Sequence, residues 1–162
     1  MGKALVLCYS FEGNTFKIAK AISAALQIDL YEIKPVKDLK STGFSKFIWG
    51  GRQVILQKKP ELLPITIDLS IYDTVFLGSP IWVGTFAPTI KTLLEDGLLH
   101  DKKIAYFYTH EGGAKNAAEK GKESVEKYNE FIGSIGLLNV MKQVDVCTKE
   151  AISWAKHIID IK

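Results

Sequence analysis

Short apolar runs alternate along the chain with stretches whose apolar residues recur at helical spacing. The apolar runs predict five strands, at residues 4–9, 29–33, 74–78, 103–109 and 138–147. The helical spacing predicts helices between and after them, at residues 14–26, 88–95, 115–135 and 149–159. Strands that alternate with helices are typical of a parallel sheet with helices on both faces. The sequence therefore predicts a doubly wound α/β fold.

Residues 35–69 do not follow this alternation. Within them, Phe44–Gln57 predicts an additional helix that is interrupted by Gly50-Gly51 and ended by Pro60 and Pro64. No repeat, low-complexity segment or linker divides the chain. We therefore expect a single domain over residues 1–162, with an irregular segment at about 35–69.

The composition is that of a globular protein. Of 162 residues, 47% are hydrophobic and 24% are charged, which argues against disorder. No apolar run reaches the ~18 residues that a membrane-spanning helix needs, and the first residues do not resemble a signal peptide. Cys8 and Cys147 are too few for a disulfide framework, which favours reduced thiols and a cytoplasmic location. The three histidines and two cysteines lack the spacing of metal ligands, so no metal site is expected.

The charge is mildly basic and unevenly distributed. A net charge of +3 with a single arginine is too small to predict nucleic-acid binding. Residues 34–59, however, contain seven basic side chains and one acidic one. This segment is either a solvated rim or a docking surface for an acidic protein or a phosphorylated small molecule.

The loop after the first strand has the features of an anion site. Gly13 permits a tight turn into a helix, whose first amides can bind an anion, and the hydroxyls of Ser10 and Thr15 add donors. Other phosphate loops do not fit. A dinucleotide loop needs more glycines, a Walker loop needs Lys after Gly13, and a Cys-x5-Arg phosphatase loop needs Arg where the chain has Asn14. A phospho-acceptor domain needs acidic residues after the first strand and an aspartate after the third, but the third strand ends in Gly78-Ser79-Pro80.

Three strand-end segments together resemble the flavodoxin family. Ser10-x-x-Gly13-Asn14-Thr15 is similar to its phosphate loop, Gly78–Gly84 with Pro88 to its second flavin loop, and Thr109–Gly113 to its third. The resemblance covers nearly the whole chain. It implies a five-stranded parallel sheet of order 2-1-3-4-5 with FMN at the carboxyl ends of the strands.

The resemblance also implies which residues contact the cofactor. The FMN phosphate would be held by Ser10, Glu12, Gly13, Asn14 and Thr15, with Glu12 contributing its backbone amide. The ring system would lie against the second loop, where Trp82 stacks on it; this loop supplies Ser79, Pro80, Ile81, Trp82, Val83 and Gly84. The other ring edge would be flanked by Thr109, His110, Glu111, Gly112 and Gly113. No catalytic side chain is implied.

The function that the resemblance implies is electron transfer between redox partner proteins. The alternative is an FMN-dependent reductase that passes electrons from NAD(P)H to a quinone or nitro compound, and a third reading is a binding domain without flavin. Two features depart from a typical flavodoxin: the chain is basic, and the third loop has no aromatic residue beyond Tyr108. The outer face of the flavin would then be open to a small-molecule acceptor, or covered by Phe47 or Trp49.

Overall fold

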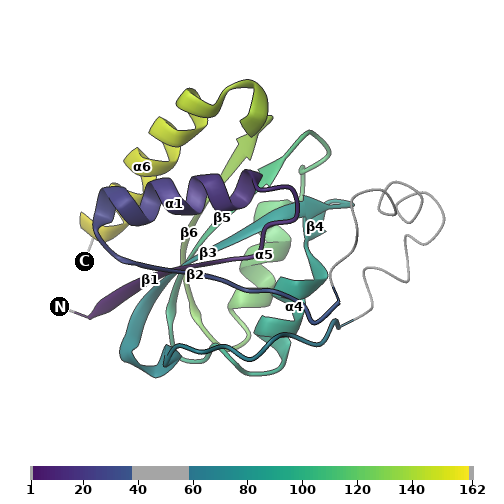
Figure 1. Ribbon diagram of the computed structural model, residues 1–162, viewed down its shortest axis with the longest axis vertical. Coiled ribbons are helices and arrows are strands. Elements are labelled where there is room, and N and C mark those ends of the chain that lie inside the picture. The colour runs from purple at the N-terminus through teal and green to yellow at the C-terminus, as the bar shows by residue number, and fades with distance from the viewer. Residues whose placement is uncertain (1, 38–58, 161–162) are drawn as a thin grey trace.

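The computed structural model describes residues 2–37 and 59–160 (Figure 1). A parallel sheet of five strands forms its centre, in the order β2-β1-β3-β5-β6. The strands are β1 (Lys3–Cys8), β2 (Asp29–Glu32), β3 (Tyr72–Trp82), β5 (Lys103–His110) and β6 (Glu130–Leu138). The two-residue strand β4 (Thr85–Phe86) pairs antiparallel with the end of β3. Counting the parallel strands alone, the order is the predicted 2-1-3-4-5.

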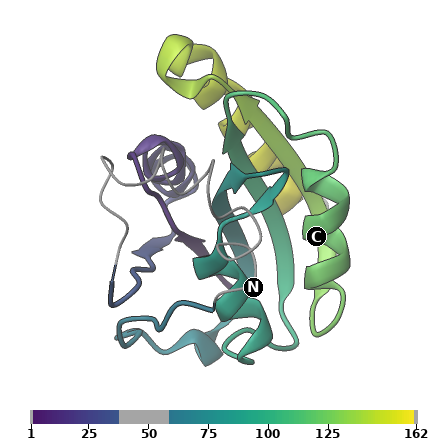
Figure 2. The same ribbon diagram turned by 90° about the vertical axis from the view of Figure 1, so that its right-hand side faces the viewer.

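Helices cover both faces of this sheet. Helices α1 (Asn14–Leu26) and α6 (Val144–Asp160) lie side by side on one face, and α4 (Pro88–Glu95) and α5 (Ala117–Val125) lie on the other (Figures 1 and 2). Two short 3₁₀ turns, Leu69–Ile71 and Val140–Lys142, complete the described elements. The doubly wound prediction is confirmed.

The core has two halves because alternate strand residues face opposite sides. On β1, Leu5 and Leu7 pack with the α4 side, while Val6 and Cys8 pack with α1 and α6. All four side chains are completely buried. This explains why β1 is an uninterrupted apolar run instead of an alternating one. Burial also raises the pKa of the Cys8 thiol, as expected for a cysteine that serves packing.

Two helices begin and end where the sequence predicts. α1 starts after Gly13, whose backbone is left-handed (φ 90°), and α4 starts with Pro88 in its first turn. Both residues mark the start of a helix by their backbone chemistry, which supports the starts that hydrophobic periodicity predicts.

The predicted helix over 115–135 is wrong in its second half. α5 ends at Val125, and residues 130–138 form β6. Gly133 adopts φ 146° at an irregularity in the pairing of β5 with β6, a conformation that a helix cannot contain. Two glycines in four residues also disfavour a helix here, since each costs about 1 kcal/mol relative to alanine.

The predicted strand over 138–147 is wrong as well. Residues 140–142 form a 3₁₀ turn, and α6 begins at Val144, five residues before the predicted helix start at 149. Cys147 does not end a strand but is buried on the inner face of α6, in line with Ala151 and Ala155. Their four-residue spacing was the helical signal that the strand prediction overlooked.

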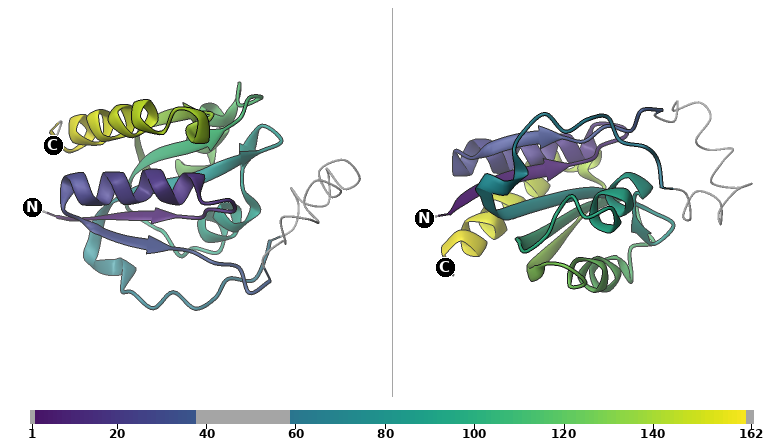
Figure 3. Two further views of the ribbon diagram at one scale, coloured as in Figure 1. Left: turned by 45° about the horizontal axis from the view of Figure 1, so that its top comes forward. Right: turned by 90° about the horizontal axis from the view of Figure 1, so that it is seen from below.

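The described ends of the irregular segment are tied together beside β2. Val36 N–H donates to the Glu61 carbonyl and Leu63 N–H to the Lys34 carbonyl, both at 2.8 Å. The chain that follows, residues 60–68, runs alongside β2 (Figure 3), and the Thr66 amide donates to the Tyr31 hydroxyl at 3.1 Å. The predicted helix Phe44–Gln57, with Phe47 and Trp49, lies outside the described residues.

Two of the lysines in the basic segment are paired with carboxylates. Lys34 lies 3.3 Å from Glu32, and Lys59 lies 3.1 Å from both Glu95 and Asp96. The charge of this segment is therefore partly neutralised where the structure describes it.

No helix in the described parts of the chain has the length and apolar character needed to cross a membrane.

Candidate functional site

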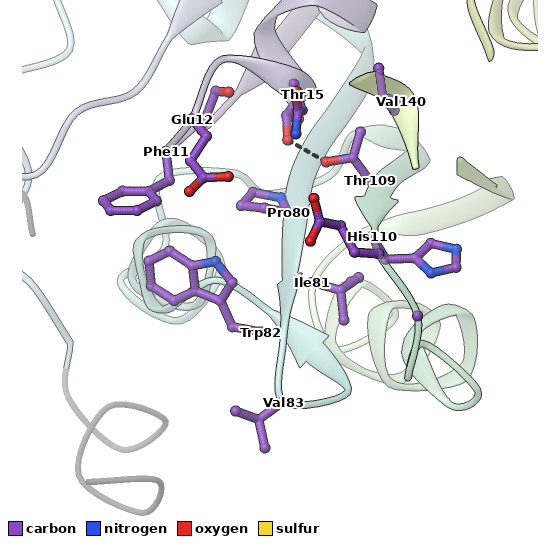
Figure 4. Close-up of a pocket in the computed structure, with 14 residues that line it drawn as sticks. Phe11, Glu12, Thr15, Pro80, Ile81, Trp82, Val83, Thr109, His110 and Val140 are labelled. Carbon is purple, nitrogen blue, oxygen red and sulfur yellow. Dashed lines mark hydrogen bonds between the residues drawn. The ribbon is translucent and has the colours of Figure 1, made fainter. Parts of the chain in front are cut away.

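A cavity of about 410 Å³ lies at the carboxyl ends of β1, β3 and β5 (Figure 4). The three loops singled out from the sequence meet there. Twelve of the sixteen predicted residues line it: Ser10, Glu12, Asn14, Thr15, Pro80, Ile81, Trp82, Val83, Thr109, His110, Glu111 and Gly112. Gly13, Ser79, Gly84 and Gly113 are not among the lining residues in the described structure. Phe11 and Val140 line the cavity although the sequence analysis did not single them out.

The first loop presents polar groups that the protein itself leaves unused. Gly13 caps α1 in a left-handed conformation, and its carbonyl accepts from Lys17 N–H at 2.9 Å. Ser10 Oγ and Asn14 Oδ1 are buried, and neither has a hydrogen-bond partner among the described residues. The amides at the start of α1 also have no partner within the helix, as at every helix N-terminus. This loop is therefore built to bind an external polar group, and an anion suits it best.

One hydrogen bond joins the first loop to the third. The hydroxyls of Thr15 and Thr109 lie 2.8 Å apart, and both side chains are buried (Figure 4). The residues are 94 positions apart in the chain. The bond holds two walls of the cavity at a fixed separation.

The second loop is a strand extension with a tight turn, which corrects the expectation of a loop over 78–84. β3 continues to Trp82, and Val83-Gly84 turn the chain into β4. Both turn residues have positive φ, 52° and 75°, as in a type I′ hairpin. Val83 is β-branched, so this conformation is strained there, and its side chain projects at the rim of the cavity (Figure 4).

Trp82 is held in the cavity wall by two other aromatic rings. Its ring is nearly perpendicular to that of Tyr9, with centroids 5.9 Å apart, and to that of Phe11, with centroids 5.8 Å apart. Edge-to-face packing of this kind fixes the ring orientation. Phe11 therefore has a positioning role that its place between Ser10 and Gly13 did not reveal.

The Ser79 hydroxyl links the start of the second loop to the start of α4 through hydrogen bonds. Its side chain is fully buried, and its hydroxyl accepts from Ala87 N–H at 3.0 Å and donates to the Pro80 carbonyl at 2.9 Å. Both hydrogen-bonding functions are thus used to fix the entry into α4. At the hairpin tip, a Cβ on Gly84 would lie 3.6 Å from the Gly113 carbonyl oxygen, so the second and third loops approach closely there.

The third loop contributes an imidazole and two glycines. Gly112 and Gly113 have φ of 127° and 69°, which explains the paired glycines. The His110 ring points away from Phe11 and Trp82 (Figure 4) and lies 5.8 Å from the Tyr108 ring. Its Nδ1 is buried without a partner among the described residues, and burial lowers the His110 pKa. A neutral imidazole is therefore favoured at neutral pH.

The only charged side chains in the described lining are the carboxylates of Glu12 and Glu111, both exposed. Because no lysine or arginine lines this described cavity, an anion in it would be held by hydroxyls, amides and the positive end of the α1 dipole.

Comparison with known proteins agrees with this geometry. The family model described as flavodoxin matches residues 3–153. The crystal structure of a flavoprotein from Lactobacillus acidophilus in complex with FMN is 28% identical, with a TM-score of 0.70, covering 88% of this chain and 98% of that one. A protein from Bacteroides eggerthii described as a flavoprotein is 25% identical, with a TM-score of 0.80, covering 98% and 99%.

More distant structures share the fold. The flavodoxin of Megasphaera elsdenii is 16% identical, with a TM-score of 0.58, covering 94% of this chain and 98% of that one. A search of curated proteins finds no match. The family model spans nearly the whole chain, from β1 into α6, and includes all three loops that form the cavity. The chain belongs to the flavodoxin family.

Proposed function

We propose that this chain binds FMN in the cavity at the carboxyl ends of β1, β3 and β5. The observation that carries the proposal is the first loop, where Ser10 Oγ and Asn14 Oδ1 are buried without partners in the described structure beside the start of α1. A phosphate monoester supplies the charge and the hydrogen-bonding oxygens that such a loop accepts. The FMN complex of the Lactobacillus acidophilus flavoprotein, similar in sequence and fold, supports the same cofactor.

Each wall of the cavity has a distinct task in this proposal. The amides after Gly13 and the hydroxyls of Ser10 and Thr15 bind the phosphate. The side chains of Ile81 and Trp82 provide an apolar wall for the flavin ring, and the backbone of residues 109–113 flanks its other edge. Bound FMN supplies the one- and two-electron redox chemistry. The protein's part is to orient the ring and to restrict water around it.

We further propose that the protein carries electrons between redox partners. Family membership supports this role, and so does the composition of the cavity. Its titratable side chains in the described lining are Glu12, Glu111 and His110, and no nucleophile or acid–base pair stands among them. Side chains of this kind can adjust the redox properties of a bound cofactor, and none of them is suited to form a covalent bond with a substrate.

An FMN-dependent reductase is the second candidate. It is favoured by the third loop, which places Gly112-Gly113 where an aromatic side chain would narrow access to the ring. A quinone or nitro compound could then approach the cofactor, with NAD(P)H as the donor.

FMN titration followed by an anaerobic reductive titration tests these proposals. Quenching of flavin fluorescence with one-to-one binding is expected, and absence of binding contradicts the site. Reduction in two separate one-electron steps, followed by visible absorption, supports the carrier. A single two-electron step, with sustained NAD(P)H oxidation when a quinone is added, supports the reductase.

A further inference from the structure

The cavity at the strand ends does not balance the charge of the ligand proposed for it. The charged side chains in its described lining are Glu12 and Glu111, and no lysine or arginine is among them. A phosphate monoester adds a charge of about −1.5 to −2 at neutral pH. The start of α1 offsets only part of this charge, since a helix N-terminus acts as a charge of roughly +0.5. In this described lining, His110 is the one side chain that can acquire a positive charge.

A stack of rings on one face of β5 holds His110 at the cavity. Ring centroids lie 5.3 Å apart between Tyr106 and Tyr108 and 5.8 Å apart between Tyr108 and His110, with the ring planes inclined by 29° and 36°. Gly121 and Gly136 leave room for the two tyrosine rings, because a Cβ on either glycine would lie within 2.6 Å of a ring atom. The position of the imidazole is therefore fixed by packing that reaches into the core.

The groups around the His110 ring favour its neutral form. Its Nδ1 is buried without a hydrogen-bond partner among the described residues, and burial lowers the His110 pKa. Its described neighbours are the Tyr108 ring on its own strand, the apolar Leu138 in register with it on β6, and the carboxylates of Glu12 and Glu111 in the same cavity lining. An anion that enters the cavity reverses this preference, since a nearby opposite charge favours the protonated imidazole.

Other cations close to the cavity are less suited to this role. Lys17 lies in α1, Lys115 follows the third loop, and Lys142 lies in the turn after β6. All three are exposed, and none of them lines the cavity. A cavity of about 410 Å³ is roughly 9 Å across, so a charge inside it lies within the ~8–10 Å over which charges interact in physiological salt. The partly buried His110 is screened less than the exposed lysines are.

We propose that His110 takes up a proton when FMN binds in this cavity, and that its imidazolium then balances part of the negative charge of the ligand. This inference rests on the proposed function, since it requires FMN at this site. The proton comes from the solvent, and at most one is taken up for each FMN. Tyr108 contributes to the charged form, because its ring offers a cation–π contact to the imidazolium. FMN affinity and proton affinity of His110 each raise the other by the same factor.

NMR of the histidine imidazoles between about pH 5 and pH 8, with and without FMN, tests the proposal on the 162-residue chain. We expect FMN to raise the pKa of His110. His100 and His157 are internal controls, because both are exposed and lie outside the cavity lining. Their pKa values should not change. Flavin fluorescence in the same samples reports whether FMN is bound.

His110→Gln keeps a side chain that can form hydrogen bonds but cannot take up the proton. As pH falls from about 8 to about 5, the FMN affinity of the native chain should rise about fivefold or more relative to this variant. The comparison cancels protonation of the FMN phosphate, which occurs in both proteins. His100→Gln is the matched control and should behave like the native chain. Calorimetric titration in buffers of different ionisation enthalpy counts the protons taken up.

The outcomes separate this inference from the proposed function. A chain that binds no FMN contradicts both of them. FMN binding with an unchanged His110 pKa overturns the proton uptake alone. A His110→Gln variant whose affinity differs from that of the native chain by the same factor at every pH also overturns it, since that result is expected if His110 only supports the loop.

Discussion

Polar side chains at the amino and carboxyl ends of the sheet differ in whether they have hydrogen-bond partners within the protein. At the amino end, the Tyr72 hydroxyl donates to Asp29 at 2.7 Å. Nearby, the Asn129 side chain accepts from Lys102 N–H and donates to the Leu99 carbonyl, both at 3.1 Å. At the carboxyl end, Ser10 Oγ and other buried polar atoms have no partner among the described residues.

This difference separates stability from function. A satisfied hydrogen bond at the amino end contributes to the folded state whether or not a ligand is bound. A buried polar atom without a partner costs free energy, roughly 1–3 kcal/mol, until something binds to it. Substitutions at the two ends should therefore affect different measurements, and four predictions examine that separation.

The largest effect on ligand binding is expected for Trp82→Ala. Loss of an aromatic wall beside a planar ring costs about 1–3 kcal/mol, so the Kd for FMN should rise about 10- to 100-fold. Flavin fluorescence should be quenched less in the bound state. Trp154→Ala serves as control, because Trp154 packs against Phe76 on the opposite face of the sheet, centroids 5.8 Å apart. Equal losses of FMN affinity in the two variants would contradict a direct contact between Trp82 and the flavin.

Asn129→Ala should lower the stability of the protein and leave FMN binding nearly unchanged. It leaves the Lys102 amide and the Leu99 carbonyl without partners, which should lower the free energy of unfolding by about 2 kcal/mol in denaturant titrations. FMN affinity should stay within about twofold, since Asn129 lies at the far end of the sheet. A marked loss of affinity would show that the two ends are coupled.

Ser10→Ala should weaken FMN binding about tenfold without destabilising the apoprotein. The hydroxyl has no described partner to lose, so its removal should leave the free energy of unfolding unchanged or slightly higher. Binding loses one hydrogen bond to a charged group. Calorimetric titration and thermal unfolding of the same sample check both halves. A destabilised apoprotein would mean that Ser10 serves the fold.

The smallest effect concerns pH and His110. Because burial lowers its pKa in the folded state, the unfolded chain binds a proton first as pH falls below about 6.5. The contribution of neutral His110 to the free energy of unfolding is therefore fully present above its pKa in the unfolded chain. It decreases as pH falls toward its lower pKa in the folded protein. His110→Gln should flatten this part of the curve of unfolding free energy against pH. An unchanged slope would assign the pH dependence to other groups.

Much of the site could be predicted because its chemistry is local in sequence. Gly13 and Pro88 fix the starts of two helices through backbone constraints, and strand-end loops of a parallel sheet meet in one place. The contact of Phe11 with Trp82 could not be predicted in this way. It depends on how two loops from separate strands approach each other, which no local pattern encodes.

The region after residue 125 was misread for a physical reason. Apolar residues in β6 lie at spacings that also fit a helix, and a short apolar run alone does not distinguish the two. Gly133 and Gly136 were the better guide, since both disfavour a helix. Val140 was missed for the same reason: the turn that carries it into the cavity lay within a predicted strand.

The hydrogen bond between Thr15 and Thr109 has a consequence for kinetics. It joins the first and third loops through protein atoms alone, so it needs no ligand in order to form. A site assembled in advance spends little entropy on ordering, and its association rate should approach that of simple diffusion to a formed pocket. Because the bond fixes the separation of two cavity walls, the rate of cofactor exchange should then be set by the rate at which the cofactor dissociates.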